Sequence, residues 1–214
     1  MIASEARPLV VVKLGGGLSA IPGALETASA GVSELARRSR VVVVPGGGPF
    51  ADAVREFDRR IGLSDDAAHW MAILAMDQYA HVLAERIERA ALVEEPGGIG
   101  AALEAGRVAV LAPYRWMRSA DVLPHTWQAT GDSVAAFVAG ALDAAHLVLV
   151  KPGEGPAEKM VDRCFAEVVP AGLPWTITGW QRLGECFGSV VVQSDHQAGQ
   201  RQDGGDPEPE HPAD

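Results

Sequence analysis

The segment at residues 9–19 constrains the fold more than any other part of this 214-residue chain. Its first six residues, LVVVKL, form an apolar run of strand length, and three glycines follow at positions 15–17. This pattern predicts a buried strand over residues 9–14, a glycine turn, and a helix that starts near Ser19 or Pro22. A strand, a glycine turn and a helix N-terminus form a common phosphate cradle, because the backbone can approach the anion and free N–H groups face it.

Lys13 is the unusual residue of this segment. It lies one position before the end of the apolar run, where a charged side chain is costly unless it has a partner. A lysine that points from a strand end towards a glycine loop indicates a phosphate ligand. The alternative is a lysine whose stem is buried while its ammonium group reaches solvent at the rim of the sheet.

The pattern of strand, glycines and helix occurs a second time. Residues 41–44 are four valines and predict a second buried strand, which Pro45 and the glycines at 46–48 follow. Residues 50–61 then have the apolar spacing of an amphipathic helix. If the strands are parallel, both glycine loops lie at the carboxyl edge of the sheet, where ligands of α/β folds bind.

The remaining elements alternate between helices and strands. Helices are predicted over 21–38, 64–91 and 132–142, and strands over 107–112, 146–151, 165–169, 175–178 and 189–193; residues 96–100 and 114–128 are interpreted as irregular, and 152–156 as a third glycine loop. This alternation predicts an α/β fold with a mostly parallel central sheet. Residues 194–214 lack apolar periodicity, which predicts a disordered tail after one domain at 1–193.

Composition excludes several classes of function. A net charge of −10 argues against a general binder of nucleic acid or of anionic membranes. No apolar run approaches the roughly 20 residues needed to span a bilayer. Cys164 and Cys186 lie far apart and form no CxxC motif, which is typical of a reduced, cytoplasmic protein.

The common nucleotide-binding motifs do not fit well. Residues 15–20 match G-x-G-x-x-A, but a dinucleotide site also needs an acidic residue at the end of the second strand. Pro45 and Gly46 stand there instead, and the chain has no GxxxxGK[ST] loop. Neither common nucleotide fold is supported.

Three segments in order point to a more specific family. They are VVKLGGGLS, VVVVPGGGPFADAVREF and TWQATGDSVAAFVAGALDAAHLVLVKPGEG. Together they resemble the amino acid kinase superfamily, which includes acetylglutamate, uridylate and isopentenyl phosphate kinases, over nearly all of residues 8–193. The resemblance implies a three-layer α/β/α sandwich that binds ATP in a C-terminal lobe and the acceptor in an N-terminal lobe. It also implies a homodimer or a higher homo-oligomer.

The segment APYRWMRSADVLPHTWQATGDS narrows this resemblance. With the short chain length, it is most similar to the small kinases of methanofuran biosynthesis, which convert an aminomethyl-furanyl-methyl phosphate to its diphosphate. The function implied is an ATP-dependent kinase that acts on a small phosphate monoester. The alternatives are a uridylate or isopentenyl phosphate kinase, an amino acid kinase that forms an acyl phosphate, and a non-catalytic protein of this fold that binds a nucleotide or oxyanion.

The resemblance also assigns roles to individual residues. Lys13 matches the lysine that contacts the transferring phosphoryl group, Asp132 matches the aspartate that orients the catalytic lysine, and Lys151 is the candidate for a second cation. The nucleotide-binding residues implied are Gly15, Gly16, Gly17, Lys151, Gly153 and Gly155. The acceptor-binding residues implied are Gly46, Gly47, Gly48, Arg115, Arg118 and Trp127. The two arginines would hold the acceptor phosphate, because a guanidinium group matches phosphate geometry.

Two further expectations concern cations. Mg2+ should share the neutralisation of charge through phosphate and oxygen ligands, and no protein metal site is assigned, since His69 and His81 are twelve residues apart on one predicted helix. The chain has Gly17 and Gly131 where relatives often have serine, and it lacks a GGM-x-x-K motif. Lys151 or Lys159 would then supply the second cation. Without the resemblance, Asp132 would read equally well as part of a helix N-cap.

Overall fold

One parallel sheet forms the centre of the computed structural model, which describes residues 7–153 and 155–185. Its strands are β1 (Leu9–Leu14), β2 (Arg40–Pro45), β3 (Ala90–Val93), β4 (Val108–Leu111), β5 (His146–Lys151) and β6 (Trp175–Gly179). Within the described residues they form a six-stranded sheet in the order β3-β4-β2-β1-β5-β6, and every strand pair is parallel. The predicted α/β class is confirmed.

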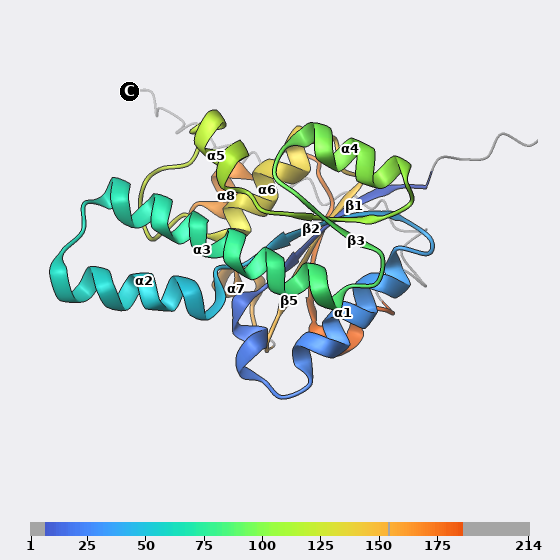
Figure 1. Ribbon diagram of the computed structural model, residues 1–214, viewed down its shortest axis with the longest axis horizontal. Coiled ribbons are helices and arrows are strands. Elements are labelled where there is room, and N and C mark those ends of the chain that lie inside the picture. Colours follow the sequence, from blue (N-terminus) through green and yellow to red (C-terminus); the bar gives the residue numbers. More distant parts are fainter. Residues whose placement is uncertain (1–6, 154, 186–214) are drawn as a thin grey trace, which may run out of the picture.

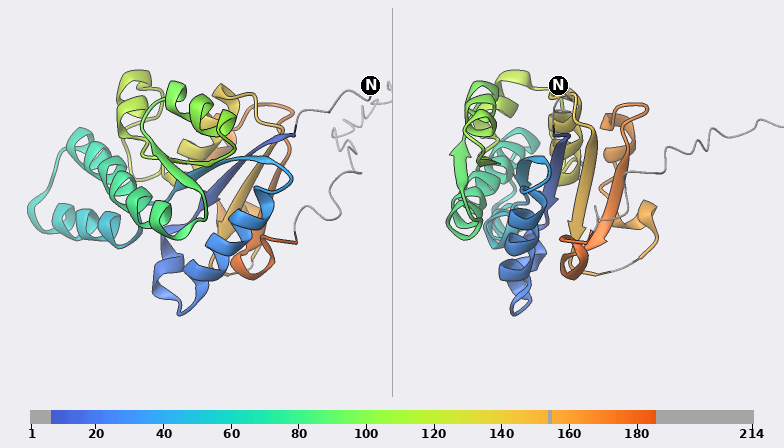
Figure 2. Two further views of the ribbon diagram at one scale, coloured as in Figure 1. Left: turned by 45° about the vertical axis from the view of Figure 1, so that its right-hand side comes forward. Right: turned by 90° about the vertical axis from the view of Figure 1, so that its right-hand side faces the viewer.

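Helices cover both faces of this sheet and complete a three-layer sandwich (Figures 1 and 2). The elements are α1 (Ala24–Leu35), α2 (Gly48–Ile61), α3 (Asp65–Arg86), α4 (Pro96–Glu104), α5 (Tyr114–Ala120), α6 (Gly131–Ala141), α7 (Ala157–Met160) and α8 (Phe165–Val168), with the short 3-10 helices η1 (Gly16–Ala20) and η2 (Trp180–Arg182). Helices α2 and α3 form a hairpin that extends away from the sheet (Figure 1). No helix in the described ranges is both long and apolar enough to cross a membrane.

Two apolar clusters hold the layers together. Successive strand residues point to opposite faces, so Val10 and Val12 pack towards α1, while Val11 packs towards α6. The first half of α3 joins the cluster that contains α4 and α6, and its second half joins the cluster that contains α1. Both faces of the central strands are therefore buried, as the continuous valine runs in the sequence require.

The order of the strands places a switch point beside β1. The chain runs from β1 to β2 on one side, and after β4 it crosses back to β5 on the other side. In register, Lys13 lies opposite Val44 of β2 and Leu149 of β5. The carboxyl ends of these three strands therefore meet, and this edge is where open α/β sheets bind ligands.

The predicted helix at 64–91 is too long. Ser64 does cap it, since its side chain accepts a hydrogen bond of 3.2 Å from the Ala67 N–H. The helix ends at Arg86, however, and Arg89 adopts a left-handed backbone with φ of 57°, after which the chain enters β3. The alanine-rich sequence favours helix, but pairing with β4 in the sheet outweighs that local preference.

Other boundaries also differ from the sequence prediction. Residues 96–100 begin α4, because proline is well suited to the first turn of a helix. Residues 114–128 include α5, and residues 165–168 form the single helical turn α8 where a strand was predicted. The predicted helix at 21–38 is the shorter α1, preceded by η1. The predicted strand at 189–193 and the tail at 194–214 lie outside the described residues.

Candidate active site

Two lysines and one aspartate meet at the carboxyl ends of β1 and β5. The Lys13 Nζ lies 3.0 Å from Asp132 Oδ1, and the Lys151 Nζ lies 2.8 and 2.7 Å from the two Asp132 oxygens. Residues Lys13, Lys151 and Asp132 are 7%, 9% and 3% exposed. Two ammonium groups share the Asp132 carboxylate, so these three side chains carry one net positive charge, which the nearby Asp162 carboxylate partly offsets. Such a cluster favours a bound anion.

Local structure explains how these side chains come together. Lys13 and Lys151 fall at the same alternating positions as Val11 and Leu149, which face α6. Asp132 lies in the first turn of α6, where a carboxylate is favoured by the helix dipole. The alternative of a solvent-reaching Lys13 is wrong, because its side chain is buried and paired with Asp132.

The charges in this cluster change each other's pKa values. Burial acts to raise the pKa of Asp132, but Lys13 and Lys151 outweigh it, and the pKa ends below its ordinary value. Burial and then the charge on Lys13 lower the pKa of Lys151, while Asp132 acts in the opposite sense. The charge on Asp162 also acts to raise the pKa of Lys151, and a phosphate oxygen near the two lysines would act in the same sense.

Asp162 is a residue that the sequence analysis missed. Its carboxylate accepts hydrogen bonds from the N–H and hydroxyl groups of both Thr130 and Ser133, at the start of α6. Its own N–H donates to Asp132 Oδ2 at 3.2 Å. Asp162 therefore positions both α6 and the carboxylate between the lysines. The spacing of Thr130 and Ser133 around Asp132 suggests a cap, but nothing local indicates a partner about thirty residues later.

The first two glycine loops pack directly against each other. A Cβ atom at Gly16 would lie 2.1 Å from the Gly48 nitrogen, and one at Gly46 would lie 2.6 Å from the Gly16 nitrogen. A Cβ at Gly131 would lie 3.3 Å from the Lys13 Cε. Side chains are therefore excluded where the loops meet, and the backbone at Gly131 lies beside the stem of Lys13.

The other predicted nucleotide-binding glycines lie towards β6. Gly153 and Gly155 border a surface groove of about 530 Å3, together with Met160, Arg182 and the residues of β6. Gly17 faces the ring of Pro152, and Gly15 donates its N–H to the Val150 carbonyl at 3.3 Å. Lys159, the alternative second cation, is exposed on α7. The structure thus brings Lys151, rather than Lys159, to Asp132.

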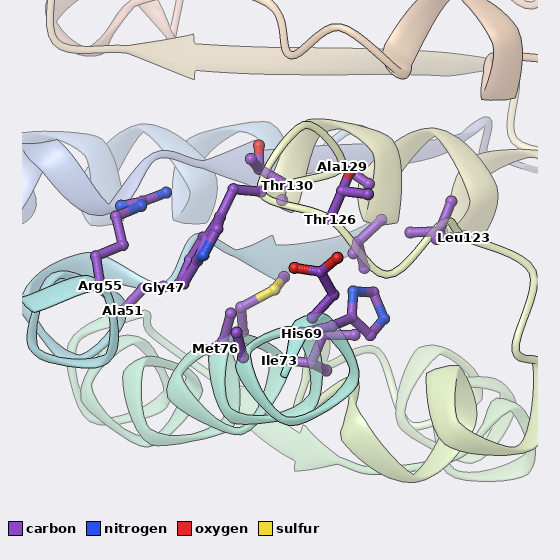
Figure 3. Close-up of a pocket in the computed structure, with 16 residues that line it drawn as sticks. Gly47, Ala51, Arg55, His69, Ile73, Met76, Leu123, Thr126, Ala129 and Thr130 are labelled. Atoms are coloured by element: carbon purple, nitrogen blue, oxygen red, sulfur yellow. The ribbon is translucent and has the colours of Figure 1, made fainter. Parts of the chain in front are cut away.

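A separate pocket opens on the other side of the lysines, between α2, α3 and the start of α6 (Figure 3). Apolar side chains form most of its wall: Ala51, Ala68, Ala72, Ile73, Met76, Leu123, Ala129 and Val134. Gly47 and Gly131 line the end near Lys13. Arg55, Asp65, His69, Thr126, Trp127 and Thr130 add polar groups. The pocket is narrow, with a volume of about 50 Å3.

The pocket runs lengthwise between α2 and α3. Along α2 it is lined by Gly47, Ala51 and Arg55, which are four residues apart and share one face. Arg55 is therefore about 12 Å further along the helix axis than Gly47. Helix α3 runs in the opposite direction to α2. This is shown by Tyr79, near the C-terminal end of α3, which packs against the backbone at Gly48, where α2 begins. The pocket has a glycine end beside the cluster of Lys13, Asp132 and Lys151 and a far end two helical turns away.

The structure separates the predicted acceptor-binding residues. Trp127 lines the pocket, and its Nε1 donates to Asp58 Oδ2 at 2.8 Å. Arg115 is exposed and pairs with Glu94 and Glu95 at 3.1 and 2.7 Å. Neither it nor the exposed Arg118 is among the residues that line this pocket. The turns of α5 direct both arginines outward.

Arg55 lines the pocket and Arg118 does not, a difference that could not be predicted from the sequence. The Arg118 guanidinium lies 4.5 Å from the centre of a Trp70 ring, away from the residues that line the pocket. Arg55 lies on α2 and does line the pocket, with its guanidinium 4.8 Å from the Trp127 ring centre. The VREF sequence marks Arg55 as a helix residue, but it carries no signal that this face of α2 lines a pocket.

His69 is the most buried polar side chain at the far end, at 6% exposed. Its ring stacks on His125 at 4.2 Å and meets Trp70 edge-on at 4.7 Å. Burial, and then the neighbouring His125, lower the pKa of His69 from 6.5 to about 4, so the ring is neutral at pH 7. His125 is held in place by Asp66 and Asp121, at 2.8 and 2.9 Å.

Comparison with known proteins shows the family to which this chain belongs. Residues 8–155 match the model of the amino acid kinase family. The chain belongs to this family. A curated relative, the [5-(aminomethyl)furan-3-yl]methyl phosphate kinase of Methanocaldococcus jannaschii, is 28% identical over 183 residues, which cover 86% of this chain and 82% of the relative. The cluster of Lys13, Asp132 and Lys151 lies within the matched range, and Asp162 lies beyond it.

Two solved uridylate kinase structures share the fold of this amino acid kinase. The Archaeoglobus fulgidus enzyme has a TM-score of 0.54 at 23% identity and covers 68% of this chain, which in turn spans only 64% of that protein. The Ureaplasma parvum enzyme has a TM-score of 0.54 at 15% identity, with 72% and 74% of the two chains covered. Membership of the family makes the chain a kinase-type phosphotransferase that uses a nucleotide.

Proposed function

We propose that this chain is an ATP-dependent kinase that transfers the γ-phosphoryl group to the phosphate of a small phosphate monoester. The observation that carries the proposal is the buried cluster in which Lys13 and Lys151 share the Asp132 carboxylate, beside two glycine loops and the apolar pocket. The leading acceptor is [5-(aminomethyl)furan-3-yl]methyl phosphate, because the M. jannaschii relative is named for that substrate and matches most of the chain.

The cluster suits this reaction because two anions must approach each other. An oxygen of the acceptor phosphate attacks the γ-phosphorus of ATP, the bond from that phosphorus to the β-γ bridging oxygen breaks, and ADP leaves. Lys13 and Lys151 offset the repulsion between the phosphates, and Asp132 holds both ammonium groups in place. The second pKa of a phosphate monoester is about 6, so the attacking oxygen is already ionised and needs no general base.

The glycine loops and pockets suggest where each substrate binds. ATP would place its adenosine end in the groove beside Gly153, Gly155 and β6, with its phosphates at residues 15–17. The acceptor would enter the other pocket with its phosphate at the glycine end, near Gly47 and the N-termini of α2 and α6. In this arrangement residues 1–193 form one domain with an N-terminal acceptor lobe and a C-terminal nucleotide lobe.

Mg2+ would be carried mainly by the nucleotide phosphates. No group of three or more His, Cys, Asp or Glu side chains in the described residues is arranged to hold a metal. Both Asp132 oxygens bind lysines, and the Asp162 carboxylate accepts hydrogen bonds from Thr130 and Ser133. Because these carboxylates already have partners, Mg2+ would reach the site with phosphate oxygens and water as its ligands. There it would neutralise part of the charge on the transferred group.

The proposal also includes a cytoplasmic enzyme that works as a homodimer or a higher homo-oligomer. The free thiol of Cys164 supports a reducing compartment. The family resemblance supports the oligomer.

An acceptor screen tests the proposed function. Purified protein with Mg-ATP is offered [5-(aminomethyl)furan-3-yl]methyl phosphate, UMP, isopentenyl phosphate and glutamate, and 31P NMR identifies the products. A diphosphate formed only from the furan acceptor is the expected result. An acyl phosphate from glutamate would indicate a carboxylate kinase, and ATP binding without turnover of any acceptor would indicate a non-catalytic protein.

A further inference from the structure

The far end of the acceptor pocket has a chemistry that phosphate transfer does not explain. Alanine side chains with Ile73, Met76 and Leu123 form much of the pocket wall, so an apolar body fits there. Beyond them lie Asp65 and His69, one turn apart on the same face of α3. Figure 3 shows His69 and Arg55 on opposite sides of the pocket. A carboxylate and an imidazole thus lie far from the lysines that receive the phosphate.

His69 is 6% exposed and contacts two aromatic rings rather than a hydrogen-bonding group of the protein. Its ring meets Trp70 edge-on at 4.7 Å and stacks on His125 at 4.2 Å. Within the part of the chain that the structure describes, neither of its ring nitrogens forms a hydrogen bond with another protein group. His69 lines the pocket, so a ligand bound there would supply a hydrogen-bond partner for the ring.

The protonation state of His69 indicates what kind of ligand this is. A neutral imidazole has one nitrogen with a free lone pair, and burial keeps this ring neutral. Asp65 adds a negative charge four residues away on the same helix face. An ammonium group has three donors and no acceptor, so it would match a lone pair and a carboxylate together.

We propose that Asp65 and His69 bind a cationic amine at the end of the acceptor remote from its phosphate. The site then selects acceptors that carry a phosphate and an ammonium group at opposite ends of a flat or slender apolar body. This inference rests on the proposed function, because it assumes that the phosphate lies at the glycine end.

Arg55 is the residue that could oppose this assignment. It lines the same pocket and would prefer an anion. Its guanidinium, however, already pairs with Asp52 at 2.9 Å and lies over the Trp127 ring, and its side chain is about half exposed. Its charge is therefore offset within α2, whereas the lone pair of His69 has no protein partner. An anionic far end is the competing outcome that the experiment must separate.

The experiment compares three probes that differ only at the far end. They are [5-(aminomethyl)furan-3-yl]methyl phosphate, the analogue with methyl in place of aminomethyl, and the analogue with carboxylate in that place. We expect the wild-type protein to favour the amine over the methyl probe by about 10- to 100-fold in kcat/KM, the scale of a hydrogen bond to a charged group. Asp65→Asn and His69→Phe should each lose most of this preference, measured as the ratio of kcat/KM for the amine probe to that for the methyl probe.

The matched control is Glu56→Gln, which removes an exposed carboxylate on α2 that pairs with Arg59 and does not line the pocket. It should keep the full preference for the amine. Melting temperatures measured on all variants show whether each one is folded, and Asp65→Asn serves if His69→Phe is not. The inference is overturned if the wild type treats amine and methyl probes alike, or if it prefers the carboxylate, which would assign the far end to Arg55.

Calorimetric titration of the same probes keeps this inference separate from the proposed function. If no probe is phosphorylated, the kinase proposal fails, yet tighter binding of the amine probe that is lost in Asp65→Asn would still support amine recognition. If all probes are phosphorylated with equal kcat/KM and bind equally, the kinase proposal stands and amine recognition fails. Absence of binding by every probe refutes amine recognition as well.

Discussion

Replacing Asp132 by asparagine should destabilise this protein strongly, although the two side chains have nearly the same size. The substitution removes the one carboxylate that both Lys13 and Lys151 contact within 3.0 Å. Breaking a buried ion pair by removing one partner costs about 3–5 kcal/mol. The cost has an upper limit, because a lysine can lose its proton instead, and at pH 7 this costs about 4.6 kcal/mol for an ordinary lysine.

Deprotonation of Lys151 costs less free energy than that of an ordinary lysine, because burial and the charge on Lys13 already lower its pKa. We therefore expect Asp132→Asn to lose about 3–4 kcal/mol of unfolding free energy at pH 7. In the variant, the folded pKa of Lys151 lies below the unfolded value, so the unfolded chain binds more protons between the two pKa values. Stability should then rise with pH, and the difference from wild type should shrink at pH 9.

A second substitution tests whether the lost stability comes from unpaired charge. Lys151→Met alone leaves the pair between Lys13 and Asp132 intact and should cost only about 1 kcal/mol. In the double variant Asp132→Asn/Lys151→Met, one of the two unpaired ammonium groups is absent. This double variant should be more stable than Asp132→Asn by about 1–2 kcal/mol, although both should lack activity.

Urea unfolding followed by circular dichroism at pH 7 and pH 9 measures all four proteins. The reasoning would be refuted if Asp132→Asn stayed within 0.5 kcal/mol of wild type. It would also be refuted if the double variant were no more stable than Asp132→Asn. Either result would mean that the three charges are not coupled in the way their distances indicate.

Three further predictions test separate parts of the structure. Lys13→Met should lower kcat at least ~100-fold with little change in melting temperature, and near-normal turnover would remove Lys13 from the reaction. Gly16→Ala should cost more than about 2 kcal/mol in urea unfolding, because its Cβ would lie 2.1 Å from the Gly48 nitrogen, whereas Gly97→Ala on α4 meets no atom within 4 Å and should not destabilise. As pH falls from 6.5 to 4, the unfolded wild-type chain binds a proton at His69 that the folded chain does not, so the wild type loses stability. His69→Phe should remove up to about 3 kcal/mol of this loss. An unchanged dependence of unfolding free energy on pH would contradict the buried, neutral ring.

Much of the sheet could be predicted from the sequence, because the relevant signal is local. The strands at residues 9–14 and 146–151 have the predicted bounds, since each is an apolar run of strand length beside a turn. The glycine loops and Lys13 were visible for the same reason, as glycines at a strand end and a charge in an apolar run stand out. The family resemblance then supplied the order of the layers.

Elements whose structure depends on distant partners were missed or misread. Residues 90–93 have no strong strand signal, and they form β3 because β4 offers a pairing edge. The single turn of α8 is too short for periodicity to distinguish it from a strand. In both places the local preferences are weak, and contacts with other parts of the chain decide the conformation.

The sequence by itself determined that a lysine, an aspartate and a second lysine stand at the ends of buried elements. Only the tertiary structure decided that all three meet, and that Asp162 holds their centre. The same holds for the arginines, since the rotation of a helix about its axis directs Arg115 to Glu94 and Glu95 but Arg55 into the pocket. That rotation is set by packing of the opposite, apolar face, which no short stretch of sequence contains.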